Sequence, residues 1–502
     1  MPSVAPASPL PARHAPEERP VRFRAFAWTG GLLAVLTGAR LVVEAVTRTR
    51  LLLDHPSGAW ATLADDLLHG TFYRPVESAL GWGGTRYPPL YPVLYAGVAR
   101  VLGSLPAAAE LLELLCLVAL VACTFLLLVR SGVRRSLALP GALGILALVP
   151  VQTLVGLGKA DLLASALAVG ALVLASTEGT RRRELVVALL FALAVLTKWT
   201  VVGGLAAWVT HAWIHGRRRL AVERVGLFLV LLAIGIAAAQ LASGGRMLQQ
   251  LHEFATGGGD PIRLLTGPFD FLMQSDPADL VLIILAGGGL AASAPGSWRT
   301  LPALAFLWTV VVTLELFASP GVAENHLLDA TVLALVAFLL SVDRGAVPAR
   351  FAAVVLPLYL VLAVGRTAPD TVDGIARSPR PAEVLSRLGP ASAGPLLAEN
   401  PWVPLLAGER PVLADAFTFR ILARRRPELM QHLTSDLDAH RFRAVVLRWP
   451  ADEPDGREWY EGAHFGPGFV DALERSYVRV ASLRTKPRAY WTHDVWVPRA
   501  QR

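Results

Sequence analysis

Residues 54–70 read DHPSGAWATLADDLLHG, and they begin only a few positions after the first long apolar run of the chain. Three aspartates, Asp54, Asp65 and Asp66, lie in this stretch, although most of the chain is leucine, alanine and valine. In LADDLLHG the leucines and the two adjacent aspartates fall on opposite faces of a helix, which predicts an amphipathic helix at a membrane surface. The stretch therefore indicates a polar loop at one face of a membrane protein.

The composition is that of a polytopic helical membrane protein. Of 502 residues, 54% are hydrophobic and 17% are charged, and the mean hydropathy is +0.49. Soluble domains carry about a quarter of charged residues, whereas here apolar runs long enough to cross about 30 Å of hydrocarbon recur. The net charge of +8 is typical of arginine-rich cytoplasmic loops, so we expect no nucleic-acid partner.

The apolar runs predict an α-helical polytopic membrane protein with about 11–12 transmembrane helices. Eleven crossings place the arginine-rich loops on one side, as the positive-inside tendency requires. Segment 88–103 opens with two prolines. Counting it as a further crossing would place three of the arginine-rich loops outside, so we predict a half-helix there. The predicted spans are 25–46, 107–130, 136–156, 160–176, 184–198, 199–215, 223–243, 278–296, 300–318, 325–342 and 349–365.

Three parts of the chain are predicted. Residues 1–24 form a disordered cytoplasmic tail, residues 25–365 form the transmembrane domain with a large outer loop at 47–87, and residues 366–502 form a small soluble α/β domain. The composition is typical of a GC-rich bacterial genome. We therefore expect a bacterial plasma-membrane protein with a cytoplasmic N-terminus and an extracytoplasmic C-terminal domain.

Within the C-terminal part, residues 427–441 are predicted to be a helix and residues 443–450 a strand. Asp436 and Asp438 spell D-x-D, but they fall in the helical stretch and are expected on a solvated face.

Most polar residues that could carry chemistry fall in the predicted outer loops. Partial desolvation beside a bilayer makes a carboxylate a stronger base, and lysine or arginine can neutralise a phosphate. Solvated loop charges and snorkelling helix ends are the alternative interpretation. The candidates are Asp54, Asp65, Asp66, Arg86 and Tyr87 in the first loop, Lys159 and Asp161 in GLGKAD, Lys198 in LTKWT, and Asn325 and His326 in GVAENH.

No metal site is predicted from the sequence. His252 and Glu253 form only an isolated HE pair, and no zinc-type Cys/His spacing occurs. A Walker A stretch and a G-x-S-x-G stretch are also missing from the sequence.

The order of these motifs resembles the GT-C superfamily of integral-membrane glycosyltransferases, which includes protein O-mannosyltransferases and aminoarabinose transferases. The resemblance covers about residues 25–365 and is carried by motifs that recur in the same order. These motifs are ADDLLHGTFY (64–73), YPPLYPVLYA (87–96), the K-A-D-L turn (159–162), the L-T-K turn (196–198) and GVAENH (321–326).

The resemblance implies transfer of a sugar from a polyprenyl-phosphate carrier to a glycan, lipid or protein acceptor at the outer face. A first-loop aspartate would deprotonate the acceptor hydroxyl for inverting attack, and basic residues would hold the phosphate. No cofactor is implied beyond this lipid-linked substrate and the membrane lipids. Applied to this chain, the resemblance implies that the base is Asp54 or Asp66, with Asp65 as a fallback. The phosphate site would consist of Arg86, Lys159 and Lys198, with Arg74 less favoured. Asn325 and His326 would line the acceptor or sugar side.

Two other functions fit the same features. A transporter or flippase of a lipid-linked sugar would use the same basic cavity without a base, although transporters often contain inverted repeats and none is evident here. A non-catalytic partner in cell-envelope glycan assembly would retain the fold, and loss of the three loop aspartates would favour it. All three aspartates are present.

Overall fold

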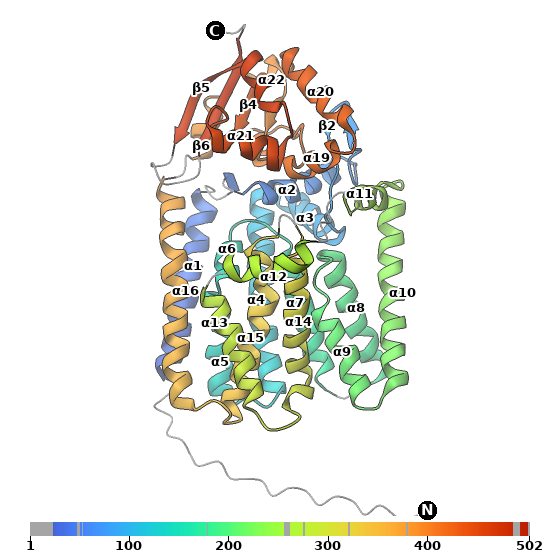
Figure 1. Cartoon of the computed structure of the whole chain (residues 1–502), viewed down its shortest axis with the longest axis vertical. Coiled ribbons are helices and arrows are strands. Elements are labelled where there is room, and N and C mark those ends of the chain that lie inside the picture. The colour runs from blue at the N-terminus through green and yellow to red at the C-terminus, as the bar shows by residue number, and fades with distance from the viewer. Residues whose placement is uncertain are drawn as a thin grey trace, which may run out of the picture.

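The computed structural model describes residues 24–47, 51–52, 54–177, 179–255, 262–274, 277–319, 322–377, 380–484 and 492–499. A bundle of long helices carries a layer of helices and strands at one end, formed by the last part of the chain (Figure 1). We call residues 380–499 the C-terminal region. The tail predicted at 1–24 lies outside the described residues except for Arg24.

The bundle is built from apolar helices that pack side by side. The most extensive pairings are α4 with α7, α7 with α8, α13 with α15, and α9 with α14. These helices are α1 (Arg24–Thr47), α4 (Leu105–Arg130), α7 (Asp161–Ala175), α8 (Arg181–Thr197), α9 (Gly203–Ile214), α10 (Arg218–Ala242), α13 (Pro277–Ala291), α14 (Leu301–Leu316), α15 (Leu328–Asp343) and α16 (Ala349–Arg377). Among the described residues, four helical stretches are long and apolar enough to cross a membrane: Phe26–Thr47, Leu105–Arg130, Arg218–Ala242 and Glu324–Asp343.

Two predicted boundaries differ from the structure. The span expected at 136–156 is broken into α5 (Arg135–Leu143), η3 (Gly144–Ala147) and α6 (Val149–Leu154). Leu148 leaves the helical conformation with a ψ of 133°, just before Pro150 in the first turn of α6, where proline is tolerated because no N–H is needed. At the other end, α16 continues well past the boundary expected at residue 365.

The segment at 88–103 forms α3 (Leu90–Leu102), which packs between α2 (His55–Leu68) and α4. Its 13 residues span only about 20 Å at 1.5 Å per residue. Figure 1 places α3 beside α2, near the C-terminal region. This position agrees with the half-helix that the sequence predicts.

The C-terminal region contains a four-stranded sheet in the order β3-β4-β6-β5. β3 (Leu396–Ala398) pairs parallel with β4 (Ala444–Leu447), and β6 (Thr492–Pro498) pairs antiparallel with both β4 and β5 (Tyr477–Arg484). The predicted helix and strand are confirmed as α20 and β4. The helices of the region are α17 (Pro381–Leu385), α18 (Trp402–Leu406), α19 (Ala416–Ala423), α20 (Pro427–Asp438), α21 (Pro454–Glu458) and α22 (Phe469–Ser476).

Helix α2 lies between the bundle and the C-terminal region (Figure 1). All residues from Ser57 to Asp66 are buried, because the C-terminal region covers the face that the sequence assigns to solvent. Trp402 donates its indole N–H to Ser57 Oγ at 2.9 Å. A Cβ on Gly58 would lie 2.6 Å from Asn400 Oδ1, so only glycine permits this close approach. The predicted helix is therefore confirmed, but its aspartate face is covered by protein.

Two further helices and a hairpin complete the loops near the C-terminal region. The hairpin pairs β1 (Glu77–Ser78) with β2 (Gly81–Trp82), and Trp82 also bridges to Leu413. The helices are α11 (Arg246–Ala255) and α12 (Arg263–Gln274).

The arginine-rich loops gather at the end of the bundle opposite the C-terminal region (Figure 1). Arg134 donates to Asp343 at 2.8 Å, and Arg130 donates to the carbonyl of Val173 at 2.6 Å. This shared end is what the positive-inside tendency requires of the cytoplasmic side. Which end faces the cytoplasm stays a prediction.

Candidate functional site

Asp54 caps the N-terminus of α2 and is only partly covered. Its Oδ2 accepts the backbone N–H of Ser57 at 2.9 Å, and its Oδ1 accepts a hydrogen bond from Lys159 Nζ at 2.9 Å. Aspartate is a favoured N-cap because its side chain satisfies a free N–H of the first turn. The side chains of Asp54 and Lys159 are 20% and 14% exposed. A carboxylate and an ammonium group thus meet at a position that a substrate can reach.

The turn that presents Lys159 is held by a carboxylate that sequence reasoning did not single out. Glu113 of α4 is 2% exposed and accepts backbone N–H bonds from Gly156 at 2.7 Å and Gly158 at 2.6 Å. Gly158 has a φ of +71°, and a Cβ there would lie 2.8 Å from that of Ala109. The signal was an acidic residue inside an apolar run, which is costly unless it binds a partner.

A second ion pair lies next to the first. Lys198 contacts Asp161 directly, and Asn325 Nδ2 donates to the same Asp161 oxygen at 2.7 Å. His326 interacts electrostatically with both members of the pair, and Lys159 interacts with Asp161. The connections before α7, after α8 and before α15 therefore converge at one place, although they lie far apart in the sequence.

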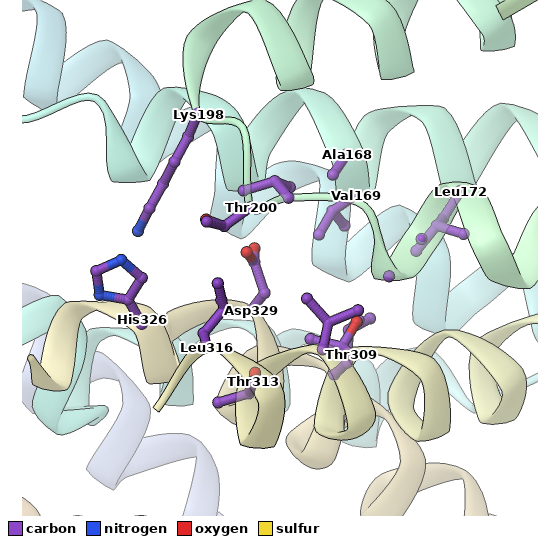
Figure 2. Close-up of a pocket in the computed structure, with 15 residues that line it drawn as sticks. Ala168, Val169, Leu172, Lys198, Thr200, Thr309, Thr313, Leu316, His326 and Asp329 are labelled. Carbon is purple, nitrogen blue, oxygen red and sulfur yellow. The ribbon is translucent and has the colours of Figure 1, made fainter. Parts of the chain in front are cut away.

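A narrow pocket extends into the bundle from this cluster. Lys198, His326 and Asp329 line it together with three threonines, and apolar residues such as Ala168 and Leu172 complete the lining. Figure 2 shows the Lys198 side chain pointing toward His326. The pocket thus has a mixed lining of charged, hydroxyl and apolar side chains.

Arg86 is held by aromatic rings at the same end of the bundle. Its guanidinium lies 4.8 Å from the ring centre of Phe417 and 5.0 Å from that of Phe254. The neighbouring Tyr87 stacks on Trp60 at 4.1 Å, and burial raises the pKa of Tyr87, which keeps its phenol neutral. Among the described residues no carboxylate forms an ion pair with Arg86, so its charge is available to an anion.

Asp66 and Asp65 lie elsewhere. They follow Asp54 by 11 and 12 positions, about 16–18 Å along α2 at 1.5 Å per residue. The Asp66 side chain is 1% exposed and bonds to Arg74 at 2.6 Å and to Arg410 at 2.8 Å. Burial raises the pKa of Asp65, and the His69 and Arg410 side chains lie 3.5 Å and 3.7 Å from its carboxylate. Both aspartates are therefore set apart from the lysines.

Arg74 likewise does not reach the site. It is 3% exposed, and besides Asp66 it binds the carbonyl of Pro411 at 2.6 Å. The structure thus brings together eight of the eleven residues proposed from the sequence, and sets Asp65, Asp66 and Arg74 apart from them. The eight are Asp54, Arg86, Tyr87, Lys159, Asp161, Lys198, Asn325 and His326.

Buried ionisable groups, most of them from the C-terminal region, lie near Asp54. The ring of His55 lies 4.4 Å from that of His464, whose Nδ1 is 2.6 Å from Glu399 Oε1. Burial, together with the neighbouring His464, lowers the pKa of His55. Burial alone would raise the pKa of Glu399, but its contact with His464 outweighs this and lowers it. Arg448, directly after β4, interacts electrostatically with both Glu399 and Asp54.

The contact between the C-terminal region and the loop that precedes α2 should depend on pH through the protonation of His493. Its Nε2 lies 3.2 Å from the carbonyl of Leu52, and burial lowers its pKa from 6.5 to about 4. Between pH 6.5 and about pH 4, His493 binds a proton in the unfolded chain but not in the folded protein. Stability should therefore fall as the pH drops from 6.5 to about 4, by on the order of 3 kcal/mol.

Melting temperatures measured across this pH range test the prediction. His493→Gln should flatten the pH dependence relative to the unaltered protein. Parallel curves for the two proteins would contradict the role of His493.

No protein-family model and no curated protein matches this chain. Solved structures do match it over nearly its whole length. One is ArnT from Cupriavidus metallidurans bound to undecaprenyl phosphate, with a TM-score of 0.56 and 14% identity over 93% of this chain and 98% of that one. Another is the archaeal oligosaccharyltransferase AglB from Archaeoglobus fulgidus in complex with an inhibitory peptide and a dolichol-phosphate. It has a TM-score of 0.52 and 11% identity over 88% of this chain and 72% of that one.

These identities are too low to carry an activity, but the coverage and the TM-scores establish a common architecture. ArnT and AglB are GT-C glycosyltransferases, and the apolar helices of the present chain are those of a membrane protein. The chain has the GT-C fold.

Proposed function

We propose that the protein is a membrane glycosyltransferase that moves a sugar from a polyprenyl-phosphate donor to an acceptor, with Asp54 as the general base. The observation that carries the proposal is the partly exposed Asp54–Lys159 pair beside the Asp161–Lys198 pair. A carboxylate base and two lysines lie close together there, and one of these lysines, Lys198, also lines the pocket that extends into the bundle. The GT-C fold supports this assignment.

The donor site follows from the charges. Lys159, Lys198 and Arg86 would surround the phosphate of the donor. The structures of ArnT with undecaprenyl phosphate and AglB with a dolichol-phosphate support a carrier of this class. The proposal includes no metal cofactor, because these side chains supply the positive charge.

The reaction would proceed by direct displacement. An Asp54 carboxylate oxygen takes the proton of the acceptor hydroxyl, and the hydroxyl oxygen attacks the anomeric carbon from the face opposite the phosphate. The bond between that carbon and the phosphate oxygen breaks, its electron pair leaves with the phosphate, and the configuration inverts. Lysine and arginine stabilise the negative charge that develops on the leaving group.

Asp54 must lose Lys159 as its partner before it can act as a base. Donor binding would separate this pair, because the donor phosphate competes for the Lys159 ammonium group and frees the Asp54 carboxylate oxygen. Asn325 and His326 would then hold Asp161 and Lys198 at the sugar or acceptor side of the pocket. The arginine-rich end of the bundle would face the bacterial cytoplasm and the C-terminal region the outer side.

Purified protein in phosphatidylcholine nanodiscs tests this function. It is offered a panel of radiolabelled polyprenyl-phosphate pentoses and hexoses with membrane-extracted acceptors, and release of polyprenyl phosphate and labelling of acceptor are followed. One donor should be turned over. Donor binding without release, together with movement of the intact donor between leaflets of sealed vesicles, would instead favour a flippase. Binding without either outcome would favour a non-catalytic assembly partner.

A further inference from the structure

A second pocket is lined by residues at the arginine-rich end of the bundle, the end that lies opposite the C-terminal region in Figure 1. It forms where the ends of α4, α7, α9 and α15 meet the start of α14. It shares no lining residue with the pocket beneath Lys198. Its ionisable lining residues are Arg130, Arg299, Arg344, His211 and His215, and its lining includes no acidic residue.

The arginines of this pocket are not neutralised by carboxylates. Arg130 donates to the carbonyl of Val173 at 2.6 Å, and Arg299 lies over the ring of Trp298 at 5.1 Å. Arg344 is exposed. Within the described part of the chain none of the three forms an ion pair, so their positive charges converge on the same space.

Neutral donors face the same space. Thr300 is the N-cap residue of α14, but it makes no side-chain capping bond, and its hydroxyl instead donates to Ser297 at 3.0 Å. Pro302 has no N–H, so the first turn of this 16-residue helix offers only the N–H groups of Leu301 and Ala303, and the helix dipole favours an anion there. Ser131 adds a buried hydroxyl with no hydrogen-bond partner among the described residues.

The surroundings place the pocket at the depth of lipid headgroups. Trp298 directly precedes the lining residue Arg299, and Trp213 lies in the last turn of α9, between His211 and His215 in the sequence. The two side chains are 45% and 50% exposed. Tryptophan is enriched at this depth because its ring is apolar and its N–H is polar. Basic pockets between membrane helices on the cytoplasmic side bind anionic headgroups.

We propose that this pocket binds the phosphate of an anionic ligand, with Arg299 and Arg344 as its principal contacts and the N-terminus of α14 as a further donor. Guanidinium groups match phosphate oxygens in bidentate geometry. The phosphate belongs either to an anionic phospholipid headgroup or to a free soluble phosphate. The site is independent of sugar transfer, which takes place at the opposite end of the bundle.

The test is a binding titration of the full-length protein by native mass spectrometry in a neutral detergent. The probes are phosphatidylglycerol, phosphatidylcholine and inorganic phosphate. The unaltered protein is compared with Arg299→Gln/Arg344→Gln. Arg182→Gln/Arg350→Gln is the matched control, because it removes the same charge from exposed arginines that do not line the pocket. Arg299→Lys/Arg344→Lys retains the charge and serves as a rescue variant.

We expect the unaltered protein and the control to bind one anionic probe in preference to phosphatidylcholine. The double glutamine variant should bind it at least about tenfold more weakly, the change that 1.4 kcal/mol produces, and the lysine variant should recover part of the affinity. Preference for phosphatidylglycerol identifies a lipid headgroup, and preference for inorganic phosphate identifies a soluble ligand. Equal losses in the glutamine variant and the control, or no anion preference at all, would overturn the proposal.

Discussion

Replacing Asp54 with asparagine is expected to lower the rate of sugar transfer at least about 100-fold, because removing a general base typically costs a factor of about 10² to 10⁴. The chain should remain folded. Asparagine caps a helix about as well as aspartate does, so the hydrogen bond from Ser57 to this side chain can persist. Lys159 loses its counter-charge, so affinity for the donor phosphate should not fall.

The measurement compares kcat and the donor KM of the unaltered protein and Asp54→Asn, with melting temperature as the test of folding. Asp65→Asn is the matched control, because it makes the same chemical change on the same helix about 16 Å away. It should retain transfer. Normal turnover by a folded Asp54→Asn protein would refute the assignment of Asp54 as the base.

The second large effect is expected on stability rather than on chemistry. Asp66→Asn leaves the guanidinium of Arg74, which is 3% exposed, without its counter-charge. Breaking a buried ion pair from one side costs about 3–5 kcal/mol. The melting temperature should therefore fall sharply. Arg410 is 32% exposed and can turn toward water, so most of the loss should come from Arg74.

A double-mutant cycle separates the ion pair from other effects of the substitution. Asp66→Asn combined with Arg74→Gln should lose less stability than the sum of the single variants, because it removes both charges. Additive losses would show that the pair is not coupled. Loss of transfer by Asp66→Asn with an unchanged melting temperature would mean that Asp66, and not Asp54, belongs to the catalytic site.

These two predictions mark where inference from the sequence was insufficient. Asp54 and Asp66 occur in the same short loop and were equivalent candidates by residue type and position. The decisive difference is Arg410, which lies 344 residues away along the chain and contacts Asp66. Local patterns cannot report a contact at that separation.

The same reason explains why Glu399, His464 and Glu113 were missed. The C-terminal region places Glu399 and His464 beside His55, although no short motif joins them. Glu113 is visible in the sequence as an acid in an apolar run, but its role depends on the backbone N–H groups of a turn more than 40 residues later.

By itself, the sequence determined the membrane-spanning character, the short helix at 88–103 and the gathering of arginines at one end. It also identified the polar turns that form the site. Each of these follows from hydrophobic run length, proline chemistry or charge distribution, which act over one helix or one loop. Only the tertiary structure decided which carboxylates are reachable and which are enclosed. It did so because burial and ion pairing depend on the element that covers a side chain, and here that element comes from the far end of the chain.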